Sequence, residues 1–144
     1  VIDSDVVVII NPITSFTDVE LSSLESYVNN GGNILVLESR DNKQSTSNEL
    51  LSPFDIKINF NLGNITDIFD GEELDLYNFS NNISYLNVAI KNQSEGKIVV
   101  VLDSYIFSDE SMSGADGRFV IPDDNQRWIF DQEYLLFEDL IFGQ

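Results

Sequence analysis

The first 38 residues carry the pattern that most limits the fold. Residues 6–10 are an unbroken run of Val and Ile between Asp5 and Asn11, which is typical of a strand buried on both faces in a parallel sheet. Residues 33–38 form a second such run, and apolar residues between the two recur at helical spacing from residue 21 to residue 28. Residues 5–38 therefore predict a βαβ unit with a right-handed crossover.

The ends of the helix in this unit have their own signals. Thr17 and Glu20 have the spacing of a capping box, and Phe16 and Leu21 stand where a hydrophobic staple would. The helix is therefore predicted to begin at Thr17. It is predicted to stop at residues 30–32, where Asn-Gly-Gly allows a left-handed turn.

The rest of the chain is less regular. Residues 97–102 form a third apolar run, expected beside the first two. Residues 56–60 and 83–90 are predicted strands of open order, because the Asn- and Asp-rich stretch between them has no clear period. Residues 39–52 predict a surface connection with a short helix at 48–51. A last helix, capped by Asp124 or Asn125 and running through Phe142, has apolar residues on most faces, so we expect it to pack across the sheet with its aromatic residues in the core.

The charge and the missing residue types exclude whole classes of function. Seven Lys and Arg against 25 Asp and Glu give a formal charge of −18, which disfavours nucleic acid and anionic lipid as partners. The chain has no Cys and no His, so thiol nucleophiles, thiolate metal sites and His-dependent triads are excluded. No apolar run is long enough to span a bilayer. Because the chain opens at Val1 without an initiator Met, we expect residues 1–144 to be a single α/β domain of a longer protein.

Two sequence blocks carry a resemblance to a known family. The first comprises the apolar strand ending at Pro12, the helix opened at residues 16–20, the Gly-Gly stop and the second strand at 34–38; the second is the strand at 96–102 that continues into Asp103 and Ser104. This pattern resembles the class I glutamine amidotransferase-like domains of an intraflagellar-transport subunit and of gliding-motility and ABC-transporter-associated proteins. The resemblance implies an α/β, three-layer flavodoxin-like sandwich with a mainly parallel central sheet.

The same resemblance implies that this chain lacks the catalytic residues of the family. In amidotransferases proper, the strand after the Gly-Gly stop leads into a nucleophile elbow that carries Cys, served by a His and an acid. Here the place holds Glu38, Ser39 and Arg40, so we expect no amidotransferase chemistry and no cofactor. Two alternatives stay open. Ser39 could act as a nucleophile with a base other than His, and Glu38 could pair with Asp103 in carboxylate chemistry.

Candidate binding residues fall in two places. Ligands of open α/β sheets bind outside the carboxyl ends of the strands, and the polar residues predicted to converge there are Asn11, Thr14, Ser39, Arg40, Asp103 and Ser104. A loop with approximate calcium-binding spacing supplies the candidate metal ligands Asp109, Ser111, Ser113 and Asp116. A second acidic cluster comprises Asp70, Glu72, Glu73 and Asp75. Both clusters are alternatively solvated acidic loops.

Together these observations favour a non-catalytic binding or scaffolding domain of a larger protein. Its expected partner is another protein or the rest of the parent chain, with a homodimer as a further option. Flanking segments would attach it to a membrane or carry it outside the cytoplasm. The alternative is a module that binds a small ligand or, weakly, a divalent cation through the strand-end and acidic-loop residues.

Overall fold

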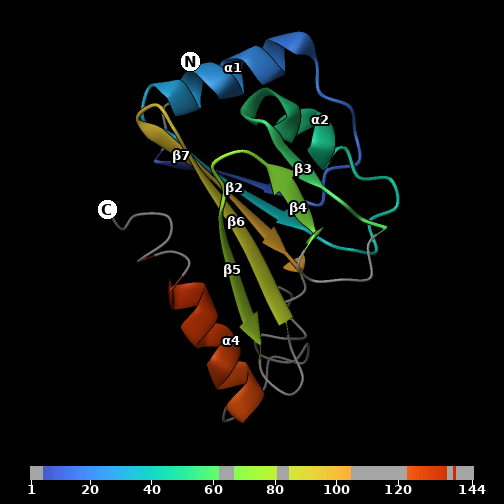
Figure 1. Ribbon diagram of the computed structural model, residues 1–144, viewed down its shortest axis with the longest axis vertical. Coiled ribbons are helices and arrows are strands. Elements are labelled where there is room, and N and C mark those ends of the chain that lie inside the picture. The colour runs from blue at the N-terminus through green and yellow to red at the C-terminus, as the bar shows by residue number, and fades with distance from the viewer. Residues whose placement is uncertain (1–4, 62–66, 81–84, 105–122, 136–137, 139–144) are drawn as a thin grey trace, which may run out of the picture.

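The computed structural model describes residues 5–61, 67–80, 85–104, 123–135 and 138, and shows an α/β domain built on a five-stranded sheet (Figure 1). The sheet order is β1-β2-β7-β6-β5. The strands are β1 (Val6–Ile10), β2 (Asn33–Glu38), β5 (Asp75–Ser80), β6 (Tyr85–Gln93) and β7 (Gly96–Leu102). A separate hairpin pairs β3 (Ile56–Ile58) with β4 (Phe69–Gly71). The helices are α1 (Asp18–Asn29), α2 (Ser47–Leu51) with the 3-10 turn η1 (Ser52–Phe54), and α4 (Asp124–Leu135).

The predicted order of strand, helix and parallel strand is confirmed. The expectation that residues 6–10 are buried on both faces is wrong, because β1 is the first strand of the described sheet and its Val8 and Ile10 are 44% and 60% exposed. β1 runs parallel to β2 with Val6 opposite Asn33, and β2 runs parallel to β7 with Glu38 opposite Leu102. The capping box is also present, since the Thr17 hydroxyl accepts from the Glu20 N–H at 3.2 Å while the Glu20 carboxylate accepts from the Thr17 N–H at 2.7 Å. The Thr17 N–H, and after it the Thr17 hydroxyl, which donates to Glu20 Oε2 at 2.9 Å, stabilise the ionised carboxylate and lower the pKa of Glu20. At the other end of α1, Gly31 has φ +96°, as a left-handed stop requires.

The expectation of a mainly parallel sheet is corrected. Of its four strand pairings, β1–β2 and β2–β7 are parallel, whereas β7–β6 and β6–β5 are antiparallel. The cause is the tight turn at Ser94 and Glu95, where Ser94 has φ 54°. A two-residue connection can join only antiparallel neighbours. The sheet is therefore mixed, with its parallel half at β1, β2 and β7.

Side chains alternate along β2 into two apolar clusters, one on each face of the sheet. Ile34 and Val36 join the cluster that includes residues of α1, α2 and the β3–β4 hairpin. Leu35 and Leu37 join the cluster on the opposite face, to which α4 contributes Ile129. Figure 1 shows α1 and α2 together above the sheet, with α4 apart from them beside β5. Fully buried strands such as β2 are typical of sheets covered on both faces.

The outcomes for the other predicted elements differ. The strand expected at 56–60 exists in part but belongs to the small hairpin, and β6 lies slightly later than the predicted 83–90. The last helix begins at Asp124, and the residue that caps it is Asp123, whose carboxylate accepts from the Gln126 N–H at 2.8 Å. The expectation of burial on most faces is wrong for its described part, because Ile129 is buried but Tyr134 is 67% exposed. Residues 136–142 of the predicted helix lie largely outside the described residues. Within the described part of the chain, no helix has the length and hydropathy to cross a membrane.

Candidate functional site

The carboxyl end of β2 holds a completely buried carboxylate. Glu38 is the last residue of β2, and its exposed fraction is 0%. It lies in the parallel half of the sheet, with β1 on one side and β7 on the other. Because a buried charge is costly unless polar partners surround it, the surroundings of this side chain decide what the site can do.

Four donors surround the Glu38 carboxylate. Oε1 accepts from the Ser39 N–H at 2.9 Å and from the Asn42 amide at 2.9 Å. Oε2 accepts from the Ser45 hydroxyl at 2.5 Å and from the buried Ser47 hydroxyl. A carboxylate has about four acceptor positions, so this local network fills its capacity. The network ties residues 39–47 to the end of β2, and Ser47 begins α2.

The sequence signal for this network was weak. A Glu at the end of a strand, followed by residues rich in Ser and Asn, fits a solvated loop as well as a buried network. The buried network forms because residues 39–47 fold back over the end of the strand. The Pro12 carbonyl stabilises this path by accepting a hydrogen bond from the Thr46 N–H at 2.9 Å. The network was therefore missed, and Glu38 had entered only as a possible partner of Asp103.

The six predicted ligand residues do not form one cluster in the structure. Asn11 and Ser104 do meet, since the Ser104 hydroxyl donates to the Asn11 side-chain oxygen at 3.2 Å. Thr14 offers its carbonyl to the Thr46 hydroxyl at 2.9 Å, and its side chain is exposed.

The remaining three predicted residues, Ser39, Arg40 and Asp103, have other surroundings. The Ser39 hydroxyl accepts from the Asp41 N–H at 3.3 Å, which is a local turn contact. Arg40 is exposed, and Asp103 is half-buried after the end of β7. The strand-end prediction thus holds for one direct pair, Asn11 and Ser104. The principal polar feature of that end is Glu38, which the predicted set did not contain.

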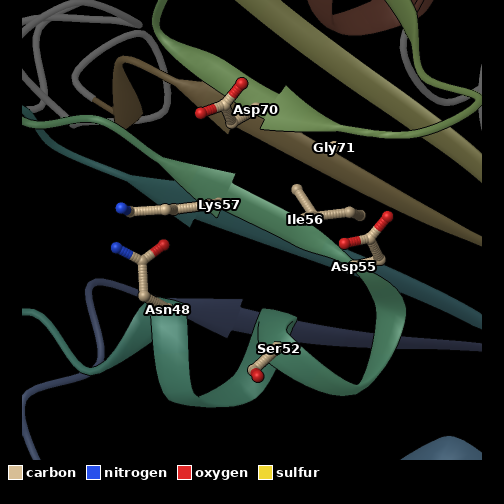
Figure 2. Close-up of a pocket in the computed structure, with 7 residues that line it drawn as sticks. All are labelled: Asn48, Ser52, Asp55, Ile56, Lys57, Asp70 and Gly71. Carbon is tan, nitrogen blue, oxygen red and sulfur yellow. The ribbon is translucent and has the colours of Figure 1, made fainter.

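A pocket of about 390 Å³ opens on the small hairpin, away from the strand ends. Four elements and the residue that joins η1 to β3 line it (Figure 2), through Asn48, Ser52, Asp55, Ile56, Lys57, Asp70 and Gly71. Figure 2 shows the Lys57 amine and the Asp55 carboxylate pointing to opposite ends of the group. Sequence analysis missed this pocket, because its lining comes from segments with no clear period.

Several pocket residues are fixed by the hairpin itself. The Asn48 side chain accepts from the Ile58 N–H at 2.7 Å and donates to the Ile58 carbonyl at 3.0 Å. Gly71 has φ +152°, and a Cβ there would lie 2.2 Å from the Asp55 carbonyl oxygen. Both contacts hold the hairpin against α2 and η1. The other polar side chains of the lining are those of Ser52, Asp55, Lys57 and Asp70, all exposed.

Asp55 links the pocket to the main sheet. Its backbone is left-handed, with φ 53°. Its Oδ2 accepts from the Glu72 N–H at 3.2 Å and lies 4.0 Å from the amine of Lys91, a largely buried residue of β6. The Asp55 side chain is 67% exposed, so its ion pair with Lys91 contributes little to stability.

The metal predictions have two outcomes. Asp109, Ser111, Ser113 and Asp116 lie outside the described residues. The other acidic cluster, residues 70–75, is described, and no group of three acidic side chains in the described ranges is arranged to hold a metal ion. Glu73 has φ 56° in the turn between β4 and β5, so the chain turns within that cluster.

The comparisons with known proteins give no relative. No protein-family model matches the chain, and no curated protein or solved structure matches it. What the fold and the site define is an α/β domain with a mixed sheet, a saturated buried carboxylate at its parallel strand end and a polar pocket on an accessory hairpin.

Proposed function

We propose that this chain is a non-catalytic domain that binds or scaffolds other proteins, and that it is a degenerate member of the class I glutamine amidotransferase-like, flavodoxin-like type. The observation that carries the proposal is the state of Glu38. At the strand end where amidotransferases carry their nucleophile elbow, this chain has a carboxylate with 0% exposure and four hydrogen-bond donors. Such a group holds a loop in place, and its lone pairs are not available to a substrate.

The surroundings of Ser39 support the same conclusion. A serine nucleophile needs a base within hydrogen-bond reach of its hydroxyl. The Ser39 hydroxyl instead accepts from the Asp41 N–H at 3.3 Å, and its own N–H donates to Glu38 at 2.9 Å. Glu38, the nearest acid in sequence, already has both oxygens engaged. Ser39 therefore serves as a turn residue.

The family proposal has partial structural support. The β1-α1-β2 unit, the Gly31 stop and β7 beside β2 follow the order that the resemblance implies. Cover on both faces of the sheet agrees with a three-layer arrangement. The antiparallel β5 and β6 depart from a mainly parallel sheet, so the relationship is argued from the parallel half.

Turnover assays test the proposal directly. The purified domain is incubated with glutamine, with chromogenic esters and with chromogenic glycosides, and release of ammonia or chromophore is followed. We expect no release above the buffer rate, and the same result for Ser39→Ala. Turnover by the wild type that disappears in Ser39→Ala or in Glu38→Gln would overturn the proposal.

The pocket on the hairpin favours a second candidate function, binding of a small charged ligand. Lys57 at one end and the carboxylates of Asp55 and Asp70 present both signs of charge around a space of about 390 Å³, which suits a small zwitterion such as an amino acid. Titration calorimetry with a panel of amino acids, and with Ca²⁺ and Mg²⁺, tests this function. Heat that is lost in Lys57→Ala but kept in Lys43→Ala, an exposed lysine outside the pocket, would support it. No heat from any member of the panel would reject it.

A further inference from the structure

One edge of β3 faces the pocket on the hairpin. The Asn59 N–H donates to the Ile68 carbonyl at 2.7 Å, so Asn59 directs its backbone toward the segment that forms β4. Along a strand, alternate residues direct their N–H and C=O groups to the same side. Lys57 therefore also directs its backbone to β4, whereas Ile56 and Ile58 direct theirs to the other edge. Figure 2 shows α2 and η1 on that other side of β3.

The two positions on this edge differ in their hydrogen bonds. The Ile58 N–H donates to the Asn48 side-chain oxygen at 2.7 Å, and the Ile58 carbonyl accepts from the Asn48 amide at 3.0 Å. Ile56 is only 3% exposed, yet its N–H and C=O have no hydrogen-bond partner among the described residues. Because the backbone groups of buried residues are nearly always paired, water or a ligand in the pocket must complete this edge.

The edge of β3 has room for the end of a chain only. Asn48 occupies the place opposite Ile58, so a strand added beside Ile56 cannot continue in that direction. It can leave only past Asp55, at the other end of the pocket (Figure 2). The volume of about 390 Å³ is in the range of small-ligand sites. A chain terminus whose last residue lies against Asn48 therefore fits this geometry.

The charges in the lining select which terminus fits. Figure 2 shows the Lys57 amine at the Asn48 end and the Asp55 carboxylate at the other. Asp70 is the cross-strand neighbour of Lys57, but no ion pair joins them in the described part of the chain. The amine thus attracts a terminal carboxylate and repels a terminal ammonium. Asp55, together with the formal charge of −18, favours basic residues before that terminus.

We propose that this pocket binds the carboxyl terminus of a basic segment of a partner protein. The main chain of the last residues pairs with the N–H and C=O of Ile56. The terminal carboxylate binds the Lys57 amine, and a Lys or Arg just before the end lies toward Asp55. Added-strand pairing and capture of a chain terminus are both recurring modes of peptide recognition. This inference rests on the protein-binding function proposed above and names its surface.

Labelled synthetic peptides test the proposal by fluorescence anisotropy. One peptide ends in Lys-Val with a free carboxylate, and a second of the same sequence ends in a carboxamide. The carboxamide peptide should bind about tenfold more weakly, because it lacks the charge that Lys57 attracts. Two further free-acid peptides carry one N-methyl group, at the last residue or at the one before it. Because alternate residues of a strand face its neighbour, one of these should lose binding while the other retains it.

Matched protein variants locate the terminal carboxylate. Lys57→Met keeps most of the side-chain stem and removes the charge, so it should bind the free-acid peptide as weakly as the wild type binds the carboxamide. The carboxamide peptide should bind Lys57→Met and the wild type equally, because both changes remove the same interaction. Lys43→Met, at an exposed lysine outside the pocket, should change neither affinity. The peptide series itself needs no variant, so it cannot be confused with unfolding.

The remaining outcomes overturn the inference. They are no binding of the free-acid peptide, equal binding of the acid and the carboxamide, equal effects of the two N-methyl groups, and equal weakening by Lys57→Met and Lys43→Met. Displacement of the peptide by free valine or lysine as readily as by unlabelled peptide would indicate the small-ligand function instead and would also overturn it. Failure here without turnover in the enzyme assays leaves the protein-binding function standing, whereas turnover removes that function irrespective of the peptide.

Discussion

Two carboxylates, Glu38 and Asp55, differ in burial and in the number of their contacts. Glu38, in the parallel half, is fully buried and accepts four hydrogen bonds from donors at positions 39–47. Asp55 joins the accessory hairpin to the antiparallel half through one N–H at 3.2 Å and an amine at 4.0 Å, with 67% of its side chain exposed. The parallel strand end is therefore built as a fixed structure, and the hairpin with its pocket is attached more loosely.

Removal of the Glu38 side chain should have the largest effect. Glu38→Ala leaves two hydroxyls, an amide and an N–H without their acceptor inside the fold, and we expect a loss of about 3 kcal/mol in the free energy of unfolding. Urea denaturation followed by circular dichroism measures it. Asp41→Ala, at an exposed position in the same loop, is the control and should change little. A loss of equal size in the control would mean that the network contributes no special stability.

Substitution of Gly96 tests the close contact between the start of β7 and the end of α1. Gly96 begins β7 after the β6–β7 turn, and a Cβ there would lie 2.2 Å from the Val28 carbonyl oxygen and 2.3 Å from that of Gly32. Gly96→Ala must push the turn away from the end of α1, which should cost about 2 kcal/mol. Thermal unfolding of Gly96→Ala beside Glu95→Ala, an exposed turn residue, measures the difference. Equal melting temperatures would show that the turn moves freely.

Asp55→Asn should have a much smaller effect than Glu38→Ala. The variant keeps the acceptor for the Glu72 N–H and loses only the attraction to Lys91, which for an exposed partner is worth about 0.5 kcal/mol. Raised salt should reduce even this difference, because it screens exposed charges. Urea denaturation at low and high salt provides the measurement. An effect as large as that of Glu38→Ala would remove the contrast between the two carboxylates.

Replacement of Glu133 in α4 is expected to stabilise the folded protein at neutral pH. Its Oε1 is buried with no hydrogen-bond partner in the described part of the chain, and desolvation raises the pKa of this carboxyl. The folded state therefore holds the Glu133 proton to a higher pH than the unfolded state does. Its ionisation costs stability, which is lost as pH rises from the ordinary pKa of a Glu through the raised value.

Glu133→Gln removes that cost. The variant should melt at a slightly higher temperature than the wild type at about pH 7, and the difference should vanish at about pH 3, where both states are protonated. Glu138→Gln, which is exposed, is the control. A variant that melts lower than the wild type at neutral pH would show that the Glu133 charge has a favourable partner.

The predictable parts of the fold are those with local signals. Thr17 and Glu20 are three residues apart and form their capping box within one turn of helix, so spacing alone identified it. The apolar runs identified β2 and β7 because a strand buried on both faces must be apolar at every position. The run at residues 6–10 identified a strand as well, but not its place at the edge of the described sheet, where Val8 and Ile10 are exposed. The antiparallel direction of β6 was missed, because the order of the predicted strands at 56–60 and 83–90 was left open and no pairing was inferred from the short connection to the next strand.

The site was less predictable than the fold, for a related reason. Asn11 and Ser104 were expected to converge, and they do, because parallel strands bring their carboxyl ends to one edge. Glu38 was not expected to be buried, because its donors lie in a loop whose path no periodicity describes. The pocket lining was likewise out of reach, since residues 48–57 and 70–71 meet only when the hairpin packs against α2.

The sequence by itself determined the βαβ unit, its helix ends, the acidic surface and the absence of thiol and imidazole chemistry, because composition and short-range spacing act within a few residues. Only the tertiary structure decided the mixed direction of the sheet, the burial of Glu38 and the exposure of Val8 and Ile10 in β1. Each of these depends on which distant segments lie side by side. Burial and pairing are properties of neighbours in space, and for residues far apart in this chain only the packed fold assigns those neighbours.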